Sequence, residues 1–234
     1  MGTGEASDGN LFINEDFAWL IGFNDAALQA VLELSDTEET RQLWKGTQFV
    51  LSYTIKLSAK TLTLGVSVTN RCPADTLDMA FCFHTYLRTP DATSVRISGL
   101  KGVDFIDKTV EGHPVKTEER EDVAVTEFTD RVYKSAPSVV TVTDPDKTLE
   151  FEKSPELADY TVWNPWDVNK LGDMGDEDYK NMICVEATAF SKGTNYKSTN
   201  VRIIIMTLIP ISGITLQPQE TWQAVHKIHL KSQL

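Results

Sequence analysis

Hydrophobic and polar residues alternate over many short runs of this chain. Residues 28–34 place Leu or Ala at every second position, with Gln29 and Glu33 between them. Because successive side chains of a strand point to opposite faces, this pattern predicts a strand with one solvated face. After this run, Asp36 followed three residues later by Glu39 predicts a capped helical turn. No helical period continues beyond about two turns.

The clearest β-hairpin is predicted by residues 49–57 and 62–68, which alternate on either side of Ser58-Ala59-Lys60. Further short apolar runs follow, divided by turn-forming residues: 95–100, 103–108, 123–128, 138–143, 149–152, 160–163, 182–187, 201–209, 214–216 and 221–230. Many short strands of this kind are typical of an all-β sandwich or barrel, and half-solvated runs mixed with apolar ones favour two packed sheets. We predict a disordered tail over residues 1–10 and one β-sandwich domain over residues 11–234.

Residues 77–88 are apolar, rich in aromatic residues and free of Gly and Pro, which predicts one continuous strand buried on both faces. Strand geometry divides its side chains into two sets: Ala80, Cys82, His84 and Tyr86 on one face, and Phe81, Phe83 and Thr85 on the other. The imidazole of His84 therefore lies beside small side chains. Two interpretations stay open: a hydrogen-bonded histidine within the core, or a group that faces a ligand.

Glu186 ends an apolar run in which Met182 and Cys184 share its face of the predicted strand. A carboxylate in such a run costs free energy unless it is paired or functional. An imidazole titrates near neutral pH and a carboxylate accepts a proton, so His84 and Glu186 together indicate acid–base chemistry. A structural role for each is the alternative, because buried ion pairs also occur in cores.

Two further segments carry candidate binding residues. Trp163 and Trp166 lie close together in Trp163-Asn164-Pro165-Trp166. Tryptophan rings commonly stack on the apolar faces of sugars, whereas the alternative is a loop that caps the core. The segment Asp130-Arg131-Val132-Tyr133, taken alone, favours a surface turn with a local ion pair.

Composition limits the classes of partner and the compartment. The 234 residues include 34 acidic and 22 basic side chains, and the formal net charge of −12 argues against nucleic-acid and membrane partners. No apolar run approaches the roughly 20 residues that span a bilayer, and the N-terminus lacks a signal-peptide pattern. Cys72, Cys82 and Cys184 lack CxxC spacing, which favours buried free thiols and a cytoplasmic protein.

The sequence gives no clear indication of a metal or an organic cofactor. His226 and His229 fall on opposite faces of a strand, which argues against a zinc site. The acidic segment 173–178 lacks the alternating ligands and the glycine of a calcium loop. There is also no phosphate-binding glycine loop. We therefore expect neither a metal nor a cofactor.

Five segments of the chain carry a family resemblance. They are, in order, Phe83-His84-Thr85-Tyr86-Leu87-Arg88, Asp130-Arg131-Val132-Tyr133, Val162-Trp163-Asn164-Pro165-Trp166, Tyr179-Lys180-Asn181-Met182-Ile183-Cys184-Val185-Glu186 and Thr215-Leu216-Gln217-Pro218-Gln219-Glu220-Thr221-Trp222. They resemble the HTYxR, DRVY, VWNPW, EYKNMVCVE and TLQPGETW motifs of the hexose-6-phosphate mutarotases, or glucose-6-phosphate 1-epimerases, of the galactose mutarotase-like group. The resemblance covers roughly Trp19 to Leu230.

The resemblance implies a galactose mutarotase-like β-supersandwich that interconverts the α and β anomers of a hexose 6-phosphate without a cofactor. Glu186 would act as general base on the anomeric hydroxyl, and His84 as general acid on the ring oxygen. Ring opening, rotation about C1–C2 and closure on the other face would follow. Asp130 would hold sugar hydroxyls, and the partner would be a small sugar or sugar phosphate.

The chain also departs from this family near its N-terminus. Members carry further N-terminal strands with phosphate-contacting arginines, and an HGFAR motif stands where this chain has Leu11-Phe12-Ile13-Asn14-Glu15. We therefore expect an N-terminally shortened sandwich with unpaired sheet edges, as a monomer or weak dimer. The missing arginines leave a second interpretation open: a non-catalytic sugar-binding sandwich that lost its phosphate site.

Overall fold

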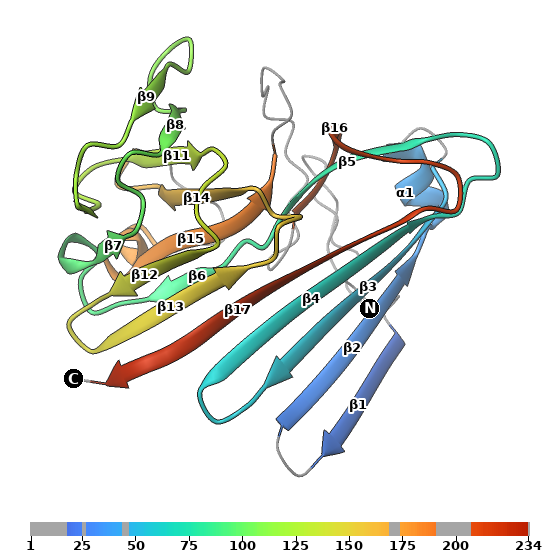
Figure 1. Cartoon of the computed structure of the whole chain (residues 1–234), viewed down its shortest axis with the longest axis horizontal. Helices are drawn as coiled ribbons and strands as arrows, with labels where there is room; N and C mark the ends of the chain where they lie inside the picture. Colours follow the sequence, from blue (N-terminus) through green and yellow to red (C-terminus); the bar gives the residue numbers. More distant parts are fainter. Residues whose placement is uncertain (1–17, 25–26, 44–46, 169–173, 191–206, 234) are drawn as a thin grey trace.

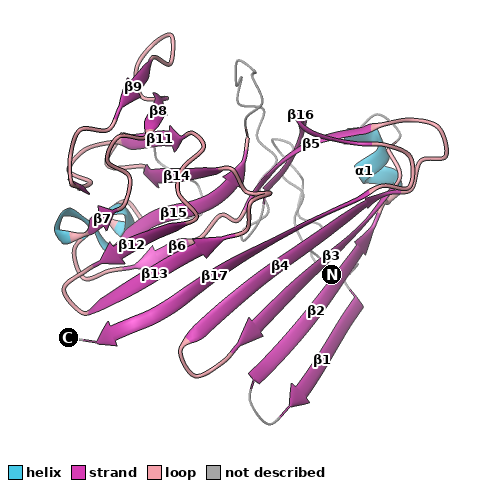
Figure 2. Ribbon diagram, viewed as in Figure 1, coloured by secondary structure: helices cyan, strands magenta, loops and turns pink. Residues whose placement is uncertain are grey.

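The computed structural model describes residues 18–24, 27–43, 47–168, 174–190 and 207–233. This part of the chain is almost entirely β, as Figure 2 shows, and its strands form two antiparallel sheets. The helical elements are α1 (Glu38–Leu43) and the 3-10 turns η1 (Ala92–Ser94) and η2 (Asp178–Asn181). None of these helices has the length and apolar composition of a membrane-spanning segment.

In the described residues, the first sheet has nine strands. Their order is β1 (Ala18–Asn24), β2 (Ala27–Ser35), β3 (Phe49–Leu57), β4 (Thr61–Asn70), β17 (Thr221–Gln233), β13 (Lys147–Lys153), β12 (Val139–Thr143), β7 (Arg96–Ser98) and β10 (Asp122–Val123). Figure 1 shows β1 to β4 and β17 side by side as a broad fan.

The second sheet has eight strands within the same described residues. Seven follow the order β16 (Thr207–Leu216), β5 (Leu77–Cys82), β15 (Met182–Ala189), β14 (Asp159–Asn164), β11 (Thr129–Tyr133), β8 (Asp104–Asp107) and β9 (Val115–Thr117), and β6 (Tyr86–Arg88) pairs with β15. The predicted all-β, two-sheet architecture is therefore confirmed.

Aromatic side chains join the two sheets in one apolar core. Phe83, next to β5, lies 6.2 Å from Tyr53 of β3 and stacks on His226 of β17 at 5.9 Å, measured between ring centroids. Phe81 of β5 contacts Trp222 of β17 at 5.3 Å. Each such large side chain removes substantial apolar area from water, so the sheets are held face to face by the hydrophobic effect.

The predictions for residues 28–68 are confirmed with one correction. The hairpin forms between β3 and β4, with Leu57 opposite Leu62. Residues 38–43 form the predicted helical turn, but its cap is Thr37 rather than Asp36. The hydroxyl of Thr37 accepts from the Thr40 amide at 3.2 Å, and the hydroxyl of Thr40 accepts from the Thr37 amide at 2.7 Å. Asp36 instead accepts from the Phe49 amide at 3.1 Å.

Two other predictions were wrong in part. Residues 123–128 are not a strand beyond Val123, although Val125 is buried. The segment 130–133 is not a surface turn: it lies in β11, between β14 and β8, because neighbouring strands satisfy its backbone on both sides. The tail over 1–10 and residues 201–206 lie outside the described part, and the single domain stays a prediction.

Candidate active site

Strand register lines up several side chains on one face of the eight-stranded sheet. Tyr86 of β6 lies opposite Cys184 of β15, Cys184 lies opposite Trp163 of β14, and Trp163 lies opposite Asp130 of β11. Directly paired residues project from the same face of a sheet. The row therefore gathers four chemically different side chains, which we call the site row.

The site row faces away from the core between the sheets. On β15, the alternate residues Ile183 and Val185 belong to the main core, whereas Cys184 packs with Trp163 and Met182 in a separate small cluster. Glu186 lies two residues beyond Cys184 and so shares its face. The strand buries one set of side chains in the core and presents the other set to the site.

The predicted strand over 77–88 is interrupted, which corrects the expectation of a continuous element. β5 ends at Cys82 and β6 begins at Tyr86, although the Phe83 amide still donates to the Ala187 carbonyl at 3.0 Å. The two predicted faces are nevertheless confirmed for Phe83, which enters the core, and for His84. The His84 ring stacks on Tyr86 at 4.7 Å and meets the edge of Trp163 at 6.0 Å.

His84 and Glu186 meet directly. Nδ1 of His84 lies 2.6 Å from Oε1 of Glu186, and their side chains are 13% and 5% exposed. The other carboxylate oxygen, Oε2, accepts from the thiol of Cys82 at 3.1 Å. Burial raises the pKa of Cys82 well above its usual range, and the negative charge of Glu186 adds to this. The thiol therefore stays protonated as a donor to the carboxylate.

Asp130, a member of the site row, is a second carboxylate on the face that carries Glu186. Its Oδ2 lies 3.0 Å from Nζ of Lys108, while Oδ1 is buried and has no hydrogen-bond partner among the described residues. Burial raises the pKa of Asp130, Lys108 offsets part of that rise, and the charge of Glu186 adds to it. A buried carboxylate oxygen without a donor is suited to a ligand hydroxyl.

Lys108 is the functional candidate that the sequence did not indicate. It follows β8, and its amide donates to the Asp130 carbonyl at 2.9 Å, which places it next to the site row. In the sequence, this position is only the end of an apolar run. Arg131 is the neighbour of Asp130 in sequence, but it projects from the opposite face of β11.

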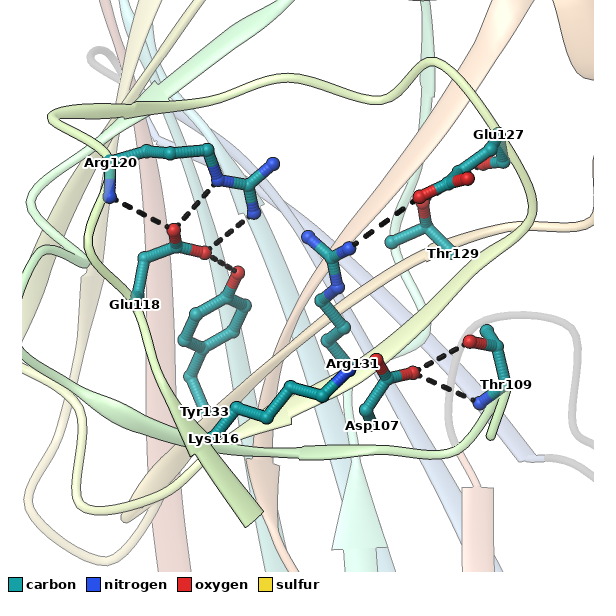
Figure 3. Close-up of polar contacts among 9 residues, drawn as sticks. All are labelled: Asp107, Thr109, Lys116, Glu118, Arg120, Glu127, Thr129, Arg131 and Tyr133. Carbon is teal, nitrogen blue, oxygen red and sulfur yellow. Dashed lines mark hydrogen bonds and ion pairs between the residues drawn. The ribbon is translucent and has the colours of Figure 1, made fainter. Parts of the chain in front are cut away.

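The opposite face of β11 carries its own polar network, drawn in Figure 3. Glu118 is buried, and its carboxylate accepts from Nε and Nη2 of Arg120, each at 2.7 Å, and from the Tyr133 hydroxyl at 2.8 Å. Arg131 lies 4.0 Å from Glu127, so its ion-pair partner lies outside the segment 130–133. This network supports the sheet from the side that the site row does not occupy.

The two tryptophans do not share one site. Trp163 is buried against His84 and Tyr86. Trp166 has a left-handed backbone (φ 51°) and contacts Tyr179 at 5.3 Å. It lines a hollow of about 410 Å³ whose lining includes neither His84 nor Glu186. Of the two predicted tryptophans, only Trp163 therefore lies beside His84 and Glu186.

The remaining candidates hold structural positions. His226 is buried and its Nδ1 lies 3.1 Å from the Glu152 carbonyl, whereas Nδ1 of His229 lies 3.0 Å from the Thr61 hydroxyl. His226 packs on Phe83 and Phe151 in the core whereas His229 is partly exposed, in agreement with the prediction that they occupy opposite faces. The three cysteines are buried free thiols, as the sequence predicted.

Comparison with known proteins identifies the class. Residues 15–199 match the family model described as aldose 1-epimerase, and the chain belongs to that family. Two relatives are named "Putative glucose-6-phosphate 1-epimerase". The one from Cenchrus ciliaris is 34% identical over 146 residues (61% of this chain), and the one from Salmonella typhimurium is 28% identical over 186 residues (76% of this chain). The chain covers 38% and 60% of these two relatives, respectively.

Solved structures share the fold. A protein described as a "putative mutarotase (YeaD)" from Salmonella typhimurium aligns with a TM-score of 0.70 at 21% identity, covering 92% of this chain and 64% of that chain. A galactose mutarotase-like protein from Clostridium acetobutylicum aligns with a TM-score of 0.66 at 17% identity, covering 92% and 66%. The predicted galactose mutarotase-like fold is confirmed.

Proposed function

We propose that the protein interconverts the α and β anomers of a hexose by acid–base ring opening. The observation that carries this proposal is the 2.6 Å contact between His84 and Glu186 on the face that also holds Asp130. Membership of the aldose 1-epimerase family supports it. Glu186 is the general base and His84 the general acid.

The reaction suits an acid and a base that touch in the free protein. The anomeric hydroxyl and the ring oxygen of a sugar are bonded to the same carbon, so two adjacent groups can reach both. Glu186 removes the hydroxyl proton while His84 protonates the ring oxygen, and the C1–O5 bond breaks. Rotation about C1–C2 and the reverse transfers close the ring on the other face. Asp130 accepts hydrogen bonds from sugar hydroxyls through its unpartnered oxygen.

The finer part of the proposal is that the hexose carries a 6-phosphate. The family motifs and the names of the two relatives support this substrate. Lys108 supplies positive charge beside the site row. In the free protein, Lys108 forms an ion pair with Asp130. We further infer a cytoplasmic protein that is a monomer or weak dimer.

Exchange NMR tests the proposal. Magnetisation transfer between the anomeric protons of glucose 6-phosphate, and separately of glucose, is measured where spontaneous exchange is slow. The protein is expected to accelerate exchange, and Glu186→Gln and His84→Ala are each expected to reduce kcat by about 10²–10⁴-fold, the usual contribution of general acid–base catalysis.

The matched control is Glu152→Gln, which changes a carboxylate that pairs with Lys227 and His229 outside the site row. Exchange at the uncatalysed rate with wild-type protein would reject the proposal. Saturable binding of a sugar in calorimetry without faster exchange would instead support the non-catalytic sugar-binding sandwich.

A further inference from the structure

Three different metal-binding side chains meet at the acid–base pair. One ligand atom from each of His84, Cys184 and Glu186 lies within 4.8 Å of the other two. We propose that this trio is a binding site for a zinc-like divalent cation, and that the bound cation blocks the acid–base pair. The metal site does not depend on the proposed sugar chemistry, although blocking is its consequence for that chemistry.

The donor types select the class of cation. Nitrogen from imidazole, sulfur from thiolate and oxygen from carboxylate are the three ligand types of zinc sites in proteins. Calcium and magnesium require oxygen ligands almost exclusively and are therefore poor candidates. Thiolate and imidazole together favour zinc, and cobalt(II) is a close spectroscopic substitute that accepts the same geometry.

The spacing requires only small side-chain movements. Zinc bonds of about 2.0–2.3 Å in a tetrahedron place ligand atoms roughly 3.3–3.8 Å apart. The three atoms are already within 4.8 Å, and His84 Nδ1 and Glu186 Oε1 at 2.6 Å must separate slightly. Three protein ligands leave the fourth position for water. The 13% exposure of the His84 side chain gives the cation a route from solvent.

Neighbouring groups hold the ligands in position. The thiol of Cys82 donates to the Oε2 atom of Glu186 and thereby orients that carboxylate. Tyr86 stacks on the face of the His84 ring, and the Trp163 ring contacts the His84 ring in an edge-to-face arrangement. Such supporting contacts around metal ligands typically contribute 10–100-fold to metal affinity.

Binding of the cation releases protons from the ligands. Bonds form from the metal to sulfur, nitrogen and oxygen, and the Cys184 thiol releases its proton to solvent. Any proton held between Nδ1 of His84 and Oε1 of Glu186 is also released, because these two atoms then bind the metal. No oxidant or reductant is required. Atoms bound to the cation cannot exchange protons with a sugar, and this blocks the pair.

The test uses the full chain, freed of metal with a chelator and titrated with cobalt(II) under reducing conditions. We expect a saturable one-to-one complex with a thiolate-to-cobalt charge-transfer band. Cys184→Ser is expected to remove this band, whereas Cys72→Ser is expected to keep it, because Cys72 is a buried thiol elsewhere, contacted by the Gln48 amide. Absence of saturable binding, or an unchanged band in Cys184→Ser, overturns the proposal.

A second variant keeps the test informative if Cys184→Ser does not fold. Circular dichroism checks each variant, and if Cys184→Ser fails to fold, His84→Gln replaces it, with cobalt affinity expected to fall at least about tenfold. Unchanged affinity in His84→Gln overturns the proposal. The cobalt spectrum is independent of anomer exchange, so the metal site and the proposed function fail separately. Where exchange is catalysed, zinc is expected to inhibit it, a chelator to restore it and magnesium to have no effect.

Discussion

The thiol of Cys82 donates to Oε2 of Glu186 at 3.1 Å, while Oε1 of the same carboxylate lies 2.6 Å from Nδ1 of His84. The carboxylate thus accepts a hydrogen bond at one oxygen and has an imidazole nitrogen within ion-pair distance of the other. A buried carboxylate with one donor removed has more rotational freedom and a larger desolvation penalty. Cys82 is therefore a positioning residue for the proposed base.

Cys82→Ala is expected to lower kcat for anomer exchange by about fivefold, the equivalent of one ordinary hydrogen bond of about 1 kcal/mol. Cys82→Ser retains a donor and is expected to restore most of the rate. Equal rates in all three proteins would assign Cys82 to packing alone.

The pairing of Asp130 with Lys108 gives a second prediction, on pH. Burial raises the pKa of Asp130, and Lys108 holds part of that rise back. If ionised Asp130 binds the sugar, kcat/KM falls as pH decreases through this raised pKa. Lys108→Met removes the opposing charge, so the acid limb should move to higher pH. An acid limb that stays at the wild-type pH in Lys108→Met contradicts this role.

Asp130→Asn separates the charge of Asp130 from its shape. The amide loses a charged acceptor, and hydrogen bonds to charged groups contribute about 1.5–3 kcal/mol, so kcat/KM should fall by about 10–100-fold. The acid limb assigned to Asp130 should disappear from the profile. Steady-state exchange rates across pH check both effects, and retention of the limb would assign it to another group.

The sequence predicted which side chains share a face, because a strand has a fixed period of two residues. Cys82, His84 and Tyr86 were grouped correctly, as were Cys184 and Glu186. The sequence alone could not show that the two faces meet, because the pairing of β15 with β6 joins segments almost a hundred residues apart. Such register is decided by packing across both sheets rather than by local pattern.

The errors have physical reasons of the same kind. Val123 and Val125 are both buried, yet only the first lies in a strand, because burial of apolar side chains does not require a backbone ladder. Asp36 and Thr37 are both favourable caps, so propensity could not choose between them. No local sequence pattern marks Lys108 as a candidate, because its role comes from its position beside Asp130 in the fold.

His226 gives a prediction about stability and pH. Its ring is fully buried between Phe83 and Phe151, and burial lowers its pKa to about 4. An unfolded histidine has a pKa near 6.5. Between these values the unfolded chain binds more protons, so the free energy of unfolding decreases as pH falls from about 6.5 to about 4, by about 3 kcal/mol in total.

His226→Phe is expected to remove this part of the pH dependence, because phenylalanine keeps the aromatic packing without a titrating nitrogen. Urea unfolding at intervals between pH 7 and pH 4 measures the slope for both proteins. His229→Phe is the control, since His229 is partly exposed and bonded to Thr61 and Glu152. An identical slope in wild type and His226→Phe would exclude His226 as its source.

In contrast to His226, Glu118 is a group whose charged form is stabilised in the folded protein. Its hydrogen bonds to Arg120 and Tyr133 outweigh the cost of burial and lower its pKa to about 2. A carboxylate with a depressed pKa contributes stability that is complete above its unfolded pKa, near 4.3, and is lost as pH falls towards 2. Glu118→Gln should therefore cost about 1–3 kcal/mol at pH 7.

That cost should shrink at pH 3, where the unfolded wild-type chain already binds the proton. Urea unfolding of both proteins at the two pH values measures the difference. Glu121→Gln is the matched control: its ion pair with Lys101 is exposed at both ends, so water screens the pair and its loss should have little effect. A cost for Glu118→Gln that is the same at pH 7 and pH 3 would show that the amide disturbs packing rather than removing a charge.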